Sequence, residues 1–150
     1  EVSTDWNDPL TFSSAILKAR GPHANPVDPS PILPMGSKAF AGRRLADVNA
    51  ETCPAARPVT VAMPAAQAFA EARAALEGAG LSIVTADLAS GRIEATAVSL
   101  LYGFKDDVVV RVRSEGAGAR IDLRAVRRNG ATDMGANCRR IETLTTAMAG

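Results

Sequence analysis

The sequence predicts an α+β domain: an antiparallel sheet of about five strands with two helices on one face, preceded by an extended Pro-rich arm. Residues 57–150 alternate between period-two and helical apolar patterns, in the order β-α-β-β-β-β-α. Short connections between the last four strands are typical of an antiparallel meander. All nine prolines lie at or before Pro64. We therefore expect an arm over residues 1–56 and a two-layer sandwich over residues 57–150.

The expected arm contains five prolines between Pro22 and Pro34. Proline has no backbone N–H and a fixed φ, so this stretch excludes a helix interior or a central strand. Residues 13–20 are compatible with a short helix. Apolar residues recur along the arm and indicate that it docks on the domain: Trp6, Leu10, Phe12, Ile16, Leu17, Ile32, Leu33 and Phe40.

The sandwich begins with a strand and a helix. Residues 57–63 alternate apolar and polar side chains, which predicts a strand. Pro64 suits the first turn of a helix, and Gly78 suits its end. The apolar positions between them have helical spacing: Ala65, Phe69, Ala72 and Leu76.

Four more strands and a closing helix complete the predicted sandwich. The strands are residues 81–87, 92–98, 107–113 and 119–126, separated by turns. Thr132 or Asp133 is suited to cap a helix that runs to about residue 149. The apolar stripe of this helix consists of Met134, Cys138, Ile141, Leu144 and Met148.

Composition limits the possible functions. A chain of 150 residues with 47% hydrophobic residues suits one domain with a packed core. A net charge of +1 and 4% aromatic residues are unlike a nucleic-acid binder. No apolar run is long enough to span a membrane. The chain begins at Glu1 without Met, so we expect either a removed upstream signal or anchor or the boundary of an engineered fragment.

The two cysteines allow two interpretations. Cys53 and Cys138 could form one disulfide in an oxidising periplasm. Alternatively they are unlinked, because free cysteine is often a small buried apolar residue.

One face of the predicted sheet is charged. Alternation places Ile93, Val110 and Leu123 on the apolar side and arginines beside acids on the other side. Three alternatives follow for this charged face. It is a solvated surface with cross-strand ion pairs, a binding surface for an anion or a partner, or a dock for the Pro-rich arm. The candidate binding residues on it are Arg111, Arg113 and Arg124.

A second candidate site lies where the last strand meets the last helix. It contains Arg128, Asp133, Asn137 and Arg140. The N–H groups at a helix N-terminus favour an anion there. The alternative is a structural junction in which Asp133 caps the helix, Asn137 holds a loop and Arg140 pairs with an acid.

The motifs of familiar catalytic and metal sites are missing. Consecutive side chains of a strand point to opposite faces, so Asp106 and Asp107 favour a strand entry over a shared metal ion. The single histidine, His23, lies among prolines, and no nucleophile motif accompanies it. We therefore predict no catalytic residue, no metal and no cofactor.

Segments spread over most of the chain share a resemblance. They are the opening residues 1–12, Arg92 to Ala97, Gly103 to Arg111, and the series Gly130-x-x-Asp133-x-Gly135-x-Asn137-x-x-Arg140-Ile141. Together they resemble the bacterial family known as domain of unknown function 1499. Members of that family often carry upstream hydrophobic segments, so the resemblance implies a cell-envelope location.

These observations favour a non-catalytic binding or assembly domain of the cell envelope. We expect it to be periplasmic, or membrane-anchored through an upstream segment and facing the periplasm. Its expected partner is an envelope protein or a small anionic or lipid ligand, not a nucleic acid. A first alternative is a carrier for a small ligand or lipid, with a cavity between helices and sheet. A second is an enzyme that uses Asp and Arg groups.

Overall fold

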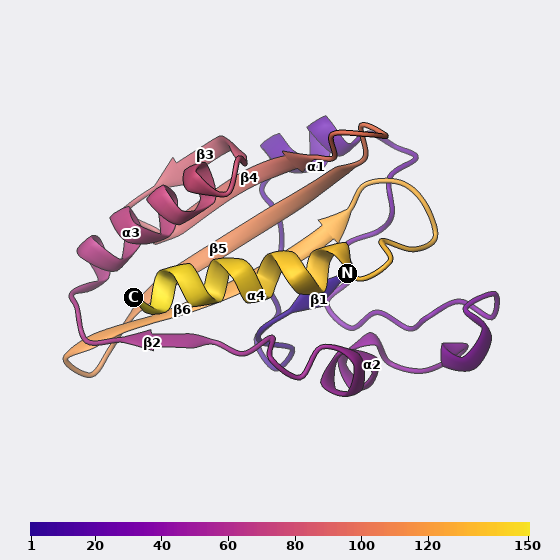
Figure 1. The fold of residues 1–150 in the computed structure, drawn as a ribbon, viewed down its shortest axis with the longest axis horizontal. Coiled ribbons are helices and arrows are strands. Elements are labelled where there is room, and N and C mark those ends of the chain that lie inside the picture. Colours follow the sequence, from indigo (N-terminus) through magenta and orange to yellow (C-terminus); the bar gives the residue numbers. More distant parts are fainter.

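The computed structural model describes residues 1–150 and consists of an antiparallel six-stranded sheet with four α-helices around it (Figure 1). The strands are β1 (Val2–Ser3), β2 (Val59–Val61), β3 (Ser82–Asp87), β4 (Arg92–Val98), β5 (Lys105–Glu115) and β6 (Gly118–Arg127). The helices are α1 (Ser14–Arg20), α2 (Leu45–Thr52), α3 (Ala65–Gly78), α4 (Ala136–Ala149) and the short 3-10 helix η1 (Lys38–Phe40).

The sheet has the order β1-β6-β5-β4-β3, and β2 also pairs with β6. Period-two alternation aligns apolar residues across its central strands. Ile93 of β4 lies opposite Val110 of β5, and Val110 lies opposite Leu123 of β6. All three are fully buried, because this face of the sheet carries the main core.

Helices α3 and α4 cover that face side by side (Figure 1). Small residues bring α3 close to the sheet, since Ala68 and Ala72 are fully buried. On α4, Ile141, Leu144 and Met148 point into the same core. The layer between helices and sheet is a cluster of 22 buried apolar residues, and its burial is the main stabilising term.

The opposite face of the sheet is also covered. Helix α1 lies against it, behind β4 and β5 in Figure 1. A smaller apolar cluster joins the N-terminal segment to two strands there: Leu10, Phe12, Ile16, Val109 and Val126. The sheet therefore has a packed layer on each side.

The predicted α+β class and antiparallel sheet are confirmed. The N-terminal segment, residues 1–56, differs from the expected extended arm because it contains β1, α1, η1 and α2. The sheet has six strands instead of about five, since β1 joins beside β6. Neither Thr132 nor Asp133 is the N-cap of the closing helix. That helix begins at Ala136, after a left-handed Gly135 with φ of 77°.

No helix of the structure has the length and apolar character needed to cross a membrane.

The core register of α4 can be tested with Ile141→Ala. Ile141 is fully buried, so its truncation should lower the free energy of unfolding by about 2–4 kcal/mol. Urea denaturation measures this change. Thr146→Ala, at an exposed position of the same helix, is the control and should be nearly neutral. A small effect of Ile141→Ala would contradict the packing of α4.

Candidate functional site

The charged face of the sheet lies beneath the N-terminal segment. Four of its charged residues are fully buried: Glu94, Asp107, Asp122 and Arg124. A buried charge is costly unless it is paired and hydrogen-bonded. Each of these four has such partners, and many of the partners come from the first 30 residues of the chain.

Arg124 is the clearest case. Its guanidinium donates to the carbonyl oxygens of Leu10 and Asp28, both at 2.6 Å. It also pairs with the carboxylate of Glu1 and lies 5.1 Å from the ring centre of Trp6. The N-terminal segment thus occupies the donors of Arg124, because the guanidinium fork can serve several acceptors at once.

Asp107 is the second anchor of this face. Arg128 binds both carboxylate oxygens at 2.8 Å, and Arg20 at the end of α1 binds one of them at 2.8 Å. The hydroxyl of Thr96 donates to the carboxylate at 2.7 Å. Burial by itself would raise the pKa of Asp107, but the hydrogen bonds from Arg128 and Thr96 outweigh it and lower the pKa below its usual value.

Glu94 holds the beginning of α1. Its carboxylate accepts the backbone N–H of Ser13 at 2.6 Å and also bonds the Ser13 hydroxyl. Arg92 and Thr85 donate to the same carboxylate from within the sheet. A carboxylate near the start of a helix is favourable because it meets free N–H groups.

Arg111 and Arg113 lie nearer the rim of the charged face. Each binds Asp122 at 3.0 Å. Each also binds Asp8 of the N-terminal segment, at 3.0 Å and 2.9 Å. Arg113 is 41% exposed and Arg111 only 16%, so the contribution of these ion pairs is smaller and more easily screened than that of Arg124.

The junction between β6 and α4 is built around Asp106, on the helix side of the sheet. Its carboxylate pairs with Arg127 at 2.9 Å and with Arg140 at 3.1 Å. Asn137 is fully buried and donates to Asp106 at 3.4 Å and to Asp133 at 2.9 Å. Asp133 also accepts the N–H of Gly135 at 2.9 Å. The carboxylates therefore occupy the donors that an external anion would need.

The structure thus distributes the sequence-predicted residues over two sides of the sheet. One group binds the N-terminal segment: Arg111, Arg113, Arg124 and Arg128. The other group forms the α4 junction: Asp133, Asn137 and Arg140. Sequence reasoning missed Arg20, because the sequence does not show that α1 lies against the charged face. The one available signal was the position of Arg20 at the end of a predicted short helix.

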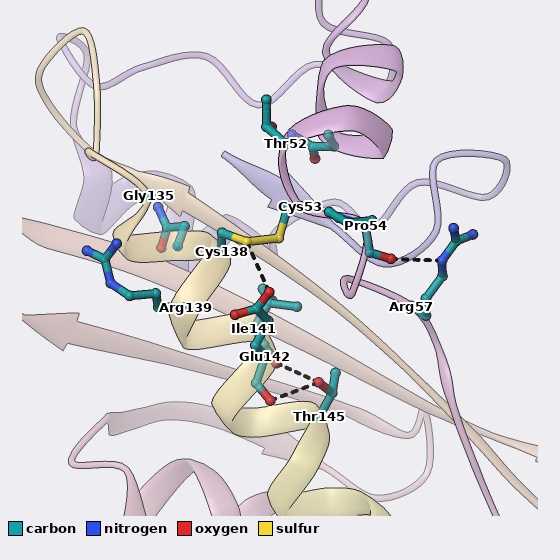
Figure 2. The surroundings of a disulfide bond; sticks show 12 residues. Thr52, Cys53, Pro54, Arg57, Gly135, Cys138, Arg139, Ile141, Glu142 and Thr145 are labelled. Carbon is teal, nitrogen blue, oxygen red and sulfur yellow. Dashed lines mark hydrogen bonds between the residues drawn. A yellow bond between two sulfur atoms is a disulfide. The ribbon is translucent and has the colours of Figure 1, made fainter.

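A disulfide links Cys53, directly after α2, to Cys138 in the first turn of α4 (Figure 2). The two Cα atoms lie 5.8 Å apart, and the bridge closes a separation of 85 residues. Glu142, one turn further along α4, lies 3.6 Å from the Cys138 sulfur. A zinc ion prefers thiolate ligands, so bridged sulfurs beside this carboxylate do not form a metal site. The bridge instead ties the N-terminal segment to the helix layer.

The turn between β4 and β5 presents apolar side chains to solvent. Leu100, Leu101 and Tyr102 are 103%, 86% and 77% exposed; we call these three residues the apolar tip. The turn is internally hydrogen-bonded, because the Ser99 N–H donates to the Phe104 carbonyl at 2.8 Å and the Phe104 N–H donates to the Ser99 hydroxyl at 2.9 Å.

Arg127 connects the turn between β4 and β5 to the neighbouring loop. Its guanidinium lies 4.8 Å from the ring centre of Phe104 and donates to the carbonyl of Thr132. Met134 follows two residues later and is 82% exposed. The β4–β5 turn and the β6–α4 loop lie at the same end of the molecule (Figure 1), and both carry exposed apolar residues.

One surface pocket has a volume of about 360 Å³. It lies beside the first turn of α3 and the β3–β4 turn, with no charged residue in its wall. Its lining residues are Ala65, Ala66, Phe69, Leu88, Ala89, Ser90, Gly91, Val112 and Ser114. Another pocket, of about 110 Å³, lies beside α2.

The fold and contacts define an α+β domain whose charged sheet face is covered by its own N-terminal segment. The chain belongs to the family described as Protein of unknown function (DUF1499), which matches residues 1–148, and the resemblance predicted from the sequence is confirmed. The crystal structure of TTHA0849 from Thermus thermophilus is similar, with 12% identity and a TM-score of 0.36 over 61% of this chain and 91% of that one. No curated protein matches the chain.

The anchoring role of Arg124 can be tested with Arg124→Met. The substitution leaves the carbonyls of Leu10 and Asp28 and the carboxylate of Glu1 without their donor, so the free energy of unfolding should fall by about 3–5 kcal/mol. Urea denaturation measures the loss, and limited proteolysis should show faster cleavage within the first 30 residues. Arg73→Met is the control, because Arg73 forms an exposed pair with Glu77 and should cost less than about 0.5 kcal/mol. Equal effects of the two substitutions would refute the anchor.

The lowered pKa of Asp107 predicts acid sensitivity. A carboxylate whose folded pKa lies below its unfolded value of about 3.9 stabilises the fold above that value. This contribution is lost as the pH falls through the folded pKa. The melting temperature of the wild type should therefore fall more steeply below about pH 5 than that of Asp107→Asn, which should be less stable at neutral pH. Asp47→Asn, in an exposed pair with Arg44, should follow the wild-type profile. Parallel profiles for Asp107→Asn and the wild type would contradict the prediction.

Proposed function

We propose that this protein is a non-catalytic docking domain of the bacterial cell envelope, facing the periplasm, and that it binds an apolar surface through the turn between β4 and β5. The observation that carries the proposal is the exposure of the apolar tip. Single exposed apolar residues are ordinary, but contiguous ones mark interaction sites. Here consecutive residues, Leu100, Leu101 and Tyr102, project from a hydrogen-bonded turn.

The size of the apolar tip is suited to reversible docking. Burying one leucine side chain contributes about 1.5–3 kcal/mol, so Leu100 and Leu101 together offer about 3–6 kcal/mol. The turn is already ordered by its internal hydrogen bonds. Little conformational entropy is then lost when the tip is buried.

The pairing of the carboxylates with arginines supports the non-catalytic part of the proposal. A general base needs a carboxylate that is free to accept a proton from a substrate. Asp106, Asp107 and Asp122 each accept from at least two arginines within the protein. The N-terminal segment further covers Asp107 and Asp122, both fully buried.

The disulfide supports an oxidising compartment. Structural disulfides persist in the bacterial periplasm, whereas the cytosol keeps thiols reduced. The Cys53–Cys138 bridge joins two separate parts of the fold, as expected of a structural cross-link. A periplasm-facing domain is consistent with this chemistry.

A sedimentation experiment tests the proposed function. Purified wild type should co-sediment with native bacterial envelope membranes, and the double variant Leu100→Ser with Leu101→Ser should lose at least about a hundredfold in affinity, because each serine removes a leucine contact. Met35→Ser with Leu88→Ser is the matched control: both residues are exposed apolar positions elsewhere, so binding should be unchanged. Unfolding curves verify that all variants remain folded. Equal binding by the tip variant and the wild type would refute docking through this turn.

A further inference from the structure

We propose that the surface bound by the apolar tip is a lipid bilayer containing anionic headgroups. This inference rests on the proposed docking function and names its partner. The tip would enter the interfacial region of one leaflet. The sheet and both of its covering layers would stay outside the hydrocarbon.

The shape of the tip favours a bilayer over a protein partner. A stable protein–protein interface takes about 800 Å² from each partner and requires a complementary surface. The tip offers a few side chains on a projecting turn, with Leu100 fully exposed at its end. Lipid is deformable and accepts a small protrusion without a matching groove.

The composition of the turn also suits an interface. Leu100 and Leu101 supply aliphatic groups for the acyl region, while the ring of Tyr102 has an apolar body and a polar hydroxyl. Tyrosine is enriched at the headgroup level for this reason. The Tyr102 and Phe104 rings lie 5.9 Å apart, and the guanidinium of Arg127 covers Phe104. Aromatic and cationic groups thus stand directly behind the leucines.

The charges around the tip complement anionic headgroups. Lys105 directly follows the turn, and α1, with Lys18 in its last turn, ends beside the start of β5, where Arg20 binds Asp107. Arg139, in the first turn of α4, donates to the carbonyl of Met134 in the neighbouring loop. All three cations are exposed and form no ion pair. The only acids in residues 96–107 are Asp106 and Asp107, which are buried and paired. Anionic lipid attracts such free cations near a membrane surface.

The backbone of the turn is compatible with shallow insertion. Unpaired backbone groups are costly in hydrocarbon. The N–H groups of Ser99, Gly103 and Phe104 are already bonded within the turn. The apex amides remain free, so they require the hydrated headgroup layer. The expected depth is therefore the interface, as for other monotopic contacts.

Protein-free vesicles separate the lipid from protein partners. The full chain should bind vesicles of phosphatidylglycerol and phosphatidylethanolamine more tightly than vesicles of phosphatidylcholine, and salt should weaken this preference. Leu100→Ser with Leu101→Ser should reduce vesicle binding at least about a hundredfold. Lys105→Gln should reduce binding to the anionic vesicles about fivefold and leave binding to phosphatidylcholine unchanged. Met35→Ser with Leu88→Ser again serves as the control.

A depth measurement adds a readout at the turn itself. Tyr102→Trp places an indole in the tip, and lipids brominated on their acyl chains should quench its fluorescence on binding. Trp6, the native tryptophan packed against Arg124, provides an internal reference and should not be quenched.

The outcomes distinguish failure of the proposed docking function from failure of the lipid inference. Binding to native envelope membranes through the tip, without binding to protein-free vesicles, would identify a protein partner; it would overturn the lipid inference and leave the docking function intact. Binding to neither would overturn both. Vesicle binding that survives the leucine substitutions, or an unquenched indole at position 102, would also overturn the lipid inference.

Discussion

The burial of charge on one face of the sheet is the constraint on which the rest of the structure depends. Arg124 and Asp107 lie in central strands and are fully buried. Charges in such a position are tolerated only when partners replace the lost water. The N-terminal segment supplies these partners through two backbone carbonyls for Arg124 and through Arg20 for Asp107. The main effect of these buried charges is therefore to determine where the first 30 residues lie. Their net contribution to stability is the smaller effect.

This arrangement explains why the N-terminal segment is fixed at several separate places. Its beginning binds Arg124, the end of α1 binds Asp107, and Cys53 is bonded to α4. The contacts approach the sheet from both of its faces, because the disulfide lies on the helix side. Large displacement of the segment would break buried ion pairs at one place while the bridge held it at another. The charged face is therefore an internal interface between the sheet and the N-terminal segment.

Sequence patterns correctly predicted the strands and helices that follow from local periodicity. The strand at residues 92–98 and the helix after Pro64 were predicted from alternation and helical spacing, and the structure contains both. Alternation also identified the charged face. It could not identify what covers that face, because the contacts between Arg124 and the carbonyls of Leu10 and Asp28 join positions far apart in the chain. The sequence also could not predict that α4 begins only at Ala136. The preceding loop contains Met134 with a φ of 51°, which is uncommon for a residue other than glycine.

The exposure of the apolar tip follows from the same packing. Val98 pairs with Lys105 at the end of the β4–β5 ladder, so the connecting turn is short and extends the two strands outward. Folding the leucines back toward either face would require breaking the bonds between Ser99 and Phe104. Both faces are moreover already occupied, one by the helix layer and the other by the N-terminal segment. The packing of both faces therefore leaves the apolar side chains of this turn exposed to solvent.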